Sequence, residues 1–219
     1  MSRSPSFWQK LSRPLMVLAP MADVTDAAFR RVITTYGKPD VLWTEFCSAD
    51  GLWHTRERQK LSDAENPLMQ DLLFDPSERP IVAQFFTADP EKMEYAAALA
   101  RQLGFDGVDI NMGCPDRSVE KQGAGAALLQ QPALAAEIIR AAKRGAGELP
   151  VSVKTRIGYH TNMLADWLPA LLREELAAVT VHARTREEMS LVPARWEHVA
   201  EAVRLRDEIA PETIILGNG

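Results

Sequence analysis

Cysteine is scarce in this chain of 219 residues, and the two that occur, Cys47 and Cys114, lie far apart. Neither belongs to a CxxC pair or to a Cys/His cluster with the spacing of zinc ligands. Two cysteines are too few for a disulfide framework. The sequence therefore predicts neither a disulfide-stapled fold nor a bound metal.

Long apolar runs are also missing. The first twenty residues contain scattered apolar side chains and several prolines, so we expect neither a signal peptide nor a membrane span. No linker rich in Gly, Ser or Pro divides the chain. We expect a cytoplasmic protein with an N-terminal extension over residues 1–14 and one domain over residues 15–219.

Positive charge is not in excess either. The formal net charge is −5, which argues against a surface that binds phosphate over its whole area. If RNA is the substrate, the basic contact must be local or come from elsewhere. The 46% of hydrophobic residues are enough for a full globular core.

Short apolar or β-branched runs alternate with helical patterns along the chain. The predicted strands cover Leu15–Ala19, Val41–Phe46, Ile81–Phe86, Gly107–Asn111, Val151–Thr155, Ala178–His182 and Thr213–Leu216. The predicted helices cover Asp26–Tyr36, Pro90–Leu103, Pro132–Arg144, Met163–Glu175 and Trp196–Ile209. Alternation of this kind indicates an α/β protein with parallel strands, either a doubly wound sheet or a (β/α)8 barrel.

The first strand-to-helix turn favours the barrel. It reads Pro20-Met21-Ala22-Asp23, where a doubly wound dinucleotide-binding fold usually has GxGxxG. About seven βα units are present and the chain ends just after the seventh strand, so we predict an incomplete TIM barrel that is one unit short. The long polar segment Gly51–Arg79, after the second strand, is a candidate lid or substrate contact.

Polar residues stand at the carboxyl ends of nearly all the predicted strands, where barrel enzymes build their active sites. They are Glu45, Gln84, Asn111, Cys114, Lys154, Arg156, His182, Arg184 and Asn218. Side chains that converge from so many strands on one end of a barrel are a stronger signal than any one of them alone. The sequence therefore predicts an active site there.

The order and spacing of several motifs resemble the FMN-dependent tRNA-dihydrouridine synthase family. These motifs are APMADVTDAAFR, DINMGCP, GAGAALL, VKTRIG, VHARTR and GNG, and the resemblance covers almost the whole chain from Leu15 onward. The most specific is DINMGCP, which ends at Pro115. The resemblance implies an NADPH-dependent flavoenzyme that reduces uridines of tRNA to 5,6-dihydrouridine and that acts as a monomer when complete.

In that family the cysteine of DINMGCP is a general acid, so the resemblance implies that Cys114 protonates C5 of the uracil ring while reduced FMN delivers hydride to C6. An ordinary thiol, with a pKa of about 8.5, is mostly protonated near neutral pH and can hold that proton. The alternative is a buried small hydrophobic residue, but Cys114 lies beside Gly113 and Pro115 in a loop. For Cys47 we prefer this structural role.

The resemblance also implies a set of flavin contacts. They are Pro20, Met21, Ala22, Gln84, Lys154, His182, Asn218 and Gly219. A lysine that ends a buried strand needs an anionic partner, and the resemblance supplies one for Lys154 in the N1/O2 edge of reduced flavin. A salt bridge at the core edge remains the alternative for Lys154, and a hydrogen-bonded core histidine the alternative for His182.

Asn111, Arg156 and Arg184 are the candidate substrate contacts, because their side chains could reach uracil, ribose or phosphate. Either arginine could instead pair with Asp or Glu. The glycines of the segment Asp116–Ala127 suggest a flexible loop behind Cys114 that closes over a flipped base. A plain surface loop is the alternative.

The chain departs from the family pattern in two places. The third strand ends in AQFFT, so that a phenylalanine stands where the family more often has a smaller residue near the flavin. The family's last barrel motif continues beyond Gly219 to a phosphate-binding Gly-Arg pair, and a helical tRNA-binding domain follows it. Two other functions are weighed against the synthase: an FMN-dependent oxidoreductase of a free pyrimidine, like dihydroorotate dehydrogenase, and a noncatalytic tRNA-binding barrel.

Overall fold

The computed structural model describes residues 6–219, in which strands and helices alternate as the sequence predicts. The first five residues of the predicted N-terminal extension lie outside this range. The strands are β1 Val17–Leu18, β2 Val41–Ser48, β3 Ile81–Phe86, β4 Gly107–Met112, β5 Val151–Arg156, β6 Ala178–His182 and β7 Ile214–Asn218. The longer helices are α1 Ala27–Gly37, α3 Pro90–Leu103, α5 Pro132–Ala146, α6 Leu164–Leu172 and α7 Glu197–Ile209.

Short helical turns lie between these elements. They are η1 Phe7–Lys10, α2 Ala49–Trp53, the π-helical turn η2 His54–Arg58, η3 Pro67–Met69, η4 Pro76–Glu78, α4 Arg117–Glu120 and η5 Gly125–Gln130. In the described part of the chain, no helix is long and apolar enough to cross a membrane.

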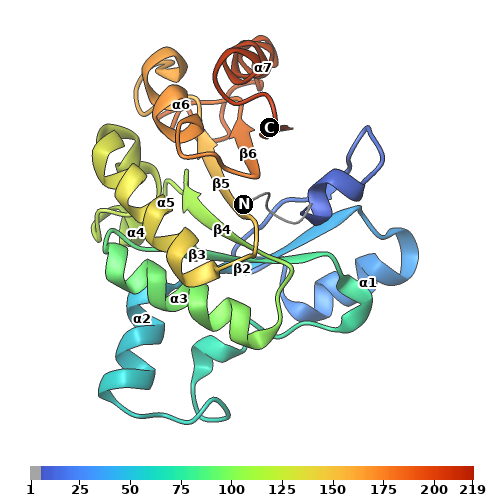
Figure 1. Ribbon diagram of the computed structural model, residues 1–219, viewed down its shortest axis with the longest axis vertical. Helices are drawn as coiled ribbons and strands as arrows, with labels where there is room; N and C mark the ends of the chain where they lie inside the picture. The colour runs from blue at the N-terminus through green and yellow to red at the C-terminus, as the bar shows by residue number, and fades with distance from the viewer. Residues whose placement is uncertain (1–5) are drawn as a thin grey trace.

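Within residues 6–219 the seven strands form one parallel sheet whose spatial order, β1-β2-β3-β4-β5-β6-β7, is the order of the sequence. A doubly wound sheet would reverse its strand order at the ligand crevice, so this order confirms the barrel topology. Figure 1 shows the sheet curling, with α2, α3, α5, α6 and α7 following one another around its outer side. The fold is therefore an incomplete (β/α)8 barrel.

Alternate residues of each strand face opposite sides of the curled sheet. In β4, Val108, Ile110 and Met112 belong to the large apolar core beneath α3 and α5, whereas Asp109 and Asn111 face the inside. Helices α3 and α5 approach closely because Gly145 has no side chain: a Cβ there would collide with the carbonyl oxygen of Glu94.

The amino-terminal half of the barrel interior is filled by apolar side chains. Trp8, from η1, is 3% exposed and its ring centroid lies 5.8 Å from that of Trp43 in β2. Val82, Ala178 and Ile214 complete this inner cluster. Trp8 of the predicted extension therefore belongs to the core, with the partly buried Phe7 packed against it.

The segment Gly51–Arg79 is not the open polar loop that the sequence suggests. Leu52, Met69 and Leu72 are buried in the main core. Near its end, Glu78 accepts a hydrogen bond from Arg30 Nε at 2.5 Å, and both side chains are almost fully buried. Turns of three to five residues are too short to show a periodic pattern, which is why the sequence did not reveal them.

Candidate active site

A cavity of about 310 Å³ opens at the carboxyl-terminal ends of the strands, and we call it the mouth cavity. Its lining is Ala19, Pro20, Met21, Phe46, Gln84, Asn111, Gly113, Cys114, Pro115, Lys154, Arg156, His182, Asn218 and Gly219. Every predicted catalytic, flavin or substrate residue is among them except Ala22 and Arg184. The strand-end residue Glu45 also lies outside the lining, and its carboxylate accepts from Asp23 N. The segment Gly51–Arg79, expected to be a lid or substrate contact, contributes no residue to this lining.

The register of the parallel sheet brings these side chains together. Asn111 pairs with Lys154 across β4 and β5. His182 in β6 pairs with Arg156 on one side and with Asn218 on the other. Inward-facing residues of neighbouring strands thus form adjacent rows at the open end of the barrel, as in other (β/α) barrels.

Ala22 is the exception in the first turn. Thr25 closes this turn, because its hydroxyl accepts from Met21 N at 3.0 Å and donates to Met21 O at 3.1 Å. Pro20 and Met21 consequently line the mouth cavity, whereas Ala22 lies one residue farther along and is exposed. The prediction that Ala22 belongs to the site is not supported by its position.

Cys114 lies in a folded loop that is hydrogen-bonded to the segment behind it. The backbone N–H of Cys114 donates to Asn111 Oδ1 at 2.9 Å, and its carbonyl accepts from Ala126 N at 2.9 Å. Gly125 has a φ of +60°, and a Cβ there would lie 2.8 Å from the Cys114 carbonyl oxygen. Glycine is needed here for a close backbone approach. Closure of this segment over a flipped base stays a prediction.

The thiol of Cys114 borders an apolar cluster. Phe46 and Cys114 pack against Phe86, Val119 and Ala124. Burial raises the pKa of the Cys114 thiol above its ordinary value, while the nearby cations Arg156 and Lys154 oppose the shift. The thiol is therefore protonated at neutral pH.

The aromatic pair beside Cys114 corrects one expectation. Phe86, near the position where the family more often has a smaller residue, is 8% exposed and packs edge-on against Phe46, with ring centroids 5.6 Å apart. Only Phe46 of the two lines the mouth cavity. The phenylalanines of β3 thus do not narrow the cavity directly.

Lys154 presents an ammonium group to the mouth cavity without a carboxylate at ion-pair distance among residues 6–219. Burial, followed by repulsion from Arg156, lowers the pKa of Lys154 to about 8, and attraction to Asp109 opposes this shift. Its side chain is therefore a cation at neutral pH that lacks a full counter-charge from the protein.

His182 is neutral in this setting. Arg184 Nη1 lies 2.9 Å from His182 Nε2, and because a guanidinium can only donate, Nε2 accepts and Nδ1 carries the proton. Burial and the cations Arg156, Lys154 and Arg184 lower the pKa of His182 to about 3. Arg184 also donates to Val192 O at 2.5 Å. Arg184 does not line the mouth cavity, but its contact with Nε2 orients the imidazole ring of His182.

Arg156 uses most of its donors on the backbone. Its Nε donates to Gly113 O, and its Nη1 donates to the carbonyls of Thr185 and Met189, each at 2.9 Å. The guanidinium thus ties the Cys114 loop to the loop after β6. Its Nη2 makes no hydrogen bond within residues 6–219, and this group is what Arg156 can offer a ligand.

A second contact, which the sequence did not indicate, also joins the Cys114 loop to the loop after β6, and we call it the clasp. Arg186 forms a bidentate ion pair with Glu120 on α4, with Nε at 2.9 and 3.0 Å from the two carboxylate oxygens. Arg186 also donates to Pro115 O at 3.4 Å, next to Cys114. Arg186 is the last residue of VHARTR, but the motif alone does not identify its partner.

Asp109 is the other functional candidate that the sequence analysis missed. It is fully buried, and its carboxylate accepts from Gln84 Nε2 at 2.6 Å and from Ser152 Oγ at 2.5 Å. Burial raises the pKa of Asp109 to about 6, although these hydrogen bonds and Lys154 oppose the shift. A carboxylate in the middle of an apolar strand was the available signal.

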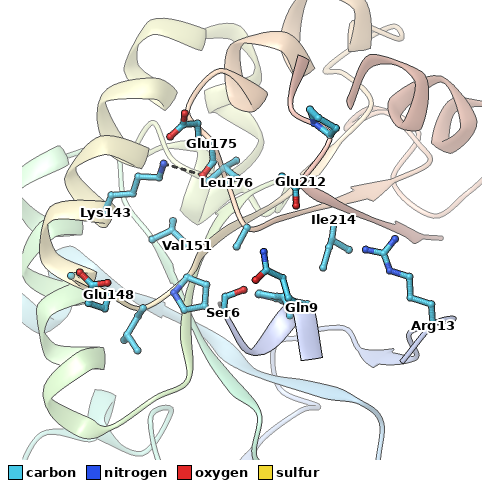
Figure 2. A pocket seen from close by; sticks show the side chains of 16 residues that line it. Ser6, Gln9, Arg13, Lys143, Glu148, Val151, Glu175, Leu176, Glu212 and Ile214 are labelled. Atoms are coloured by element: carbon cyan, nitrogen blue, oxygen red, sulfur yellow. Dashed lines mark hydrogen bonds between the residues drawn. The ribbon is translucent and has the colours of Figure 1, made fainter. Parts of the chain in front are cut away.

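A second cavity, of about 400 Å³, lies at the opposite end of the barrel and is called the basal cavity. Figure 2 shows Glu148, Glu175 and Glu212 around it, with Lys143 Nζ donating to Glu175 O at 3.0 Å. The three carboxylates outnumber the two cations of the lining, Arg13 and Lys143, and none of the predicted site residues lines this space. The basal cavity is larger, but the chemical groups lie at the mouth cavity.

Known proteins match nearly the whole chain. A family model described as dihydrouridine synthase (Dus) matches residues 17–219. A protein of Bacillus subtilis (strain 168) named "Probable tRNA-dihydrouridine synthase 2" is 45% identical over 215 residues, which is 98% of this chain and 63% of the relative. A protein of Staphylococcus aureus (strain COL) named "Probable tRNA-dihydrouridine synthase" is 42% identical with the same coverage.

The chain thus spans about 63% of the length of the curated relatives that it matches. Among solved structures, the orotidine 5'-monophosphate decarboxylase of Methanocaldococcus jannaschii aligns with a TM-score of 0.50 at 14% identity, over 93% of this chain and 89% of that one. At this identity the likeness concerns the fold alone.

Proposed function

The chain belongs to the dihydrouridine synthase family, and from this premise we propose that it reduces the C5=C6 bond of uridines in tRNA at the mouth cavity. The observation that carries the proposal is a protonated thiol, Cys114, at the edge of a cavity that also presents the cation Lys154. An acid and a cation side by side suit the addition of a proton and a hydride to a ring.

The residues present fit the ring of FMN. The volume of about 310 Å³ is at the lower end of the range of roughly 300–1,000 Å³ that small-molecule pockets occupy. Lys154 offers an ammonium without an ion-paired carboxylate, and Asn218 and Met21 line the same space. When bound, FMN would supply the hydride that goes to C6, with NADPH as the source of reducing equivalents.

The roles of Lys154 and His182 follow from their charges. Lys154 would bind the anionic N1/O2 edge of reduced flavin, because an anion there compensates the ammonium that the protein leaves without an ion-pair partner. His182, kept neutral chiefly by burial and oriented by Arg184, would donate its Nδ1 proton in a hydrogen bond without adding a second charge.

Cys114 would hold a proton at Sγ and give it to C5 of the uracil. The new C5–H bond takes the electron pair of the former double bond, and the resulting thiolate regains a proton from solvent. Burial keeps the thiol protonated beforehand, while Arg156 and Lys154 stabilise the thiolate as it forms. Hydride and proton together add two hydrogen atoms to the ring, which balances the reaction.

Fewer side-chain groups are available to contact the substrate than the sequence suggests. Asn111 has its carbonyl oxygen bound to the N–H groups of Gly113 and Cys114, and one amide N–H donates to Gln84 Oε1, so only the second amide N–H is left for a uracil oxygen. Arg156 can offer Nη2. A uridine must leave its stack to reach these groups. The cytoplasmic location expected from the sequence stays a prediction.

A chimera tests the function. This chain would replace the matching part of the B. subtilis relative, and the purified protein would be incubated with FMN, NADPH and unmodified tRNA, with dihydrouridine measured by mass spectrometry. We expect activity that Cys114→Ala lowers by about 10²–10⁴-fold, the contribution typical of a general acid. Cys47→Ala, at a buried thiol outside the cavity, is the matched control. An active Cys114→Ala variant would refute the assigned acid.

A further inference from the structure

A line of hydrogen bonds runs from the barrel interior to the backbone of Cys114. Asp109 Oδ2 accepts from Gln84 Nε2 at 2.6 Å, and Gln84 Oε1 accepts from Asn111 Nδ2 at 3.3 Å. Asn111 Oδ1 then accepts from Gly113 N at 3.1 Å and from Cys114 N at 2.9 Å. We call Asp109, Gln84 and Asn111 the amide relay.

The two ends of the amide relay fix its direction. An ionised carboxylate can only accept, so Gln84 must present its NH₂ group to Asp109 and its oxygen to Asn111. A backbone N–H can only donate, so Asn111 must present its oxygen to the Cys114 loop and its NH₂ group to Gln84. The two requirements agree, and neither amide can turn over without opposing two like groups.

Burial raises the free-energy cost of reversing either side-chain amide. Asp109 and Gln84 are fully buried, and Asn111 is 6% exposed. In such a setting a reversed amide would leave unsatisfied donors and acceptors that water cannot reach. The remaining oxygen of Asp109 is bound by Ser152, which holds the carboxylate in place from the neighbouring strand β5.

We propose that Asp109 is a positioning residue, which sets the amide orientations of Gln84 and Asn111 and thereby fixes the backbone that carries Cys114. The importance of this for catalysis rests on the proposed function, since it matters because Cys114 is the acid. The relay itself is a property of the folded chain. It also gives Asn111 a role different from the predicted one, because its oxygen serves the loop and not the substrate.

Exchanging the two polar groups tests the relay. Gln84→Glu places two carboxyl groups against each other, so the relay breaks where both are ionised, and the measurements are made at alkaline pH so that the pair does not keep a shared proton. Adding Asp109→Asn restores it, because the amide introduced at position 109 donates to the carboxylate introduced at position 84, which still accepts from Asn111. The oxygen of the introduced amide still accepts from Ser152. Asp109→Asn alone is tolerated, because its oxygen can face Gln84 while its NH₂ group faces Ser152 Oγ.

The readouts need neither flavin nor RNA. Hydrogen exchange of the Gly113 and Cys114 amides, and alkylation of Cys114 followed by peptide mapping, would be measured on the full chain. We expect Gln84→Glu to speed amide exchange by about tenfold or more and to raise the alkylation rate, and the double variant to return both to within about twofold of the original. Melting curves show whether each variant is folded.

Asp109→Leu keeps the test decisive if Gln84→Glu does not fold, because it removes the acceptor without adding a charge. Asp106→Asn is the matched control. Asp106 lies just before β4, the strand that carries Asp109, and accepts from Ile81 N at 2.9 Å, but it lies outside the relay. Folded relay variants with unchanged exchange at Gly113 and Cys114, or a double variant no better than Gln84→Glu, would overturn the proposal. Either result would leave the catalytic test of Cys114 unaffected.

Discussion

Inward-facing side chains at the amino-terminal ends of the strands are apolar, whereas those at the carboxyl-terminal ends are polar or charged. At the first end, Trp8 packs with Trp43, Val82 and Ile214. At the other end, Lys154, His182 and Asn218 line a cavity. Strand β7 carries both kinds, with Ile214 at its start and Asn218 at its end, so the sheet itself does not distinguish them.

The apolar end of the barrel interior contributes stability, whereas the polar end contributes chemical groups. The apolar end removes large side chains from water and stabilises the fold. The polar end holds a desolvated ammonium whose pKa is lowered to about 8, which costs folding free energy unless an anionic ligand compensates it. The basal cavity is the larger of the two, although the predicted site residues line the mouth cavity.

Trp8→Ala is expected to have the largest effect on stability and little effect on the mouth cavity. Trp8 is 3% exposed, and truncating such a side chain lowers the free energy of unfolding by about 3–5 kcal/mol. Urea unfolding measures this loss. The alkylation rate of Cys114 under native conditions should stay the same, and a changed rate in the folded variant would show that the two ends are coupled.

Lys154→Met should do the opposite, raising stability while weakening flavin binding. Below about pH 8 the folded protein carries the desolvated ammonium, whereas the unfolded chain keeps its proton up to about pH 10.4. The stability of the original protein therefore rises between these values, because there the unfolded state still binds a proton that the folded state has lost. We expect the variant to be more stable by about 1–3 kcal/mol at pH 7, allowing for partial solvent contact, and the gain to shrink by pH 10.

Urea unfolding at pH 7 and pH 10 measures this difference. Lys121→Met, at an exposed lysine of the turn after α4, is the control and should change stability little at either pH. A loss of stability in Lys154→Met at pH 7 would contradict the assignment of Lys154 as a residue that is kept for a ligand.

Glu120→Gln is expected to weaken the clasp with Arg186 and thereby to lower the free energy of unfolding by about 1–2 kcal/mol. The pKa of Glu120 is lowered, chiefly by its hydrogen bonds to Arg186 and Tyr159, which outweigh the effect of burial. The clasp therefore stabilises the protein above the ordinary carboxyl pKa of about 4.3 and loses its effect as pH falls through the lowered value. The unfolding free energies of the two proteins should differ at pH 7 and converge near pH 3.

Phe46→Ala should have the smallest effect, a shift in the titration of Cys114. Removing an apolar neighbour admits water and lowers the pKa of the thiol toward its ordinary value. The alkylation rate of Cys114 at pH 8 should rise, with Tyr36→Ala, at an 88% exposed ring, as the control. An unchanged pH profile would show that Phe46 does not set the pKa of the Cys114 thiol.

The sequence predicted the elements whose pattern is local. Helix α3 was predicted with its observed bounds, because Asp89 and Pro90 mark its start and Gly104 its end. Strand β3 also has its predicted bounds, Ile81–Phe86. The residues of the mouth cavity could be predicted because every strand end of a barrel points the same way.

Features that depend on packing could not be predicted. The position of Trp8 inside the barrel follows from contacts with strands far along the chain. The roles of Arg184 and Asn111 changed because their partners are known only in three dimensions, Nε2 of His182 for one and the Cys114 backbone for the other. The relay through Asp109 likewise needs the register of β3, β4 and β5.

The most direct test of the central claim is a fluorescence titration of FMN into the chimera and its two variants Lys154→Met and Glu148→Gln, one at each end of the barrel. We predict that FMN binds the original protein and Glu148→Gln with the same Kd, and binds Lys154→Met at least about tenfold more weakly, the loss expected when a buried charge partner is removed. Binding that is weakened by Glu148→Gln and unaffected by Lys154→Met would place the flavin at the basal cavity and contradict the assignment.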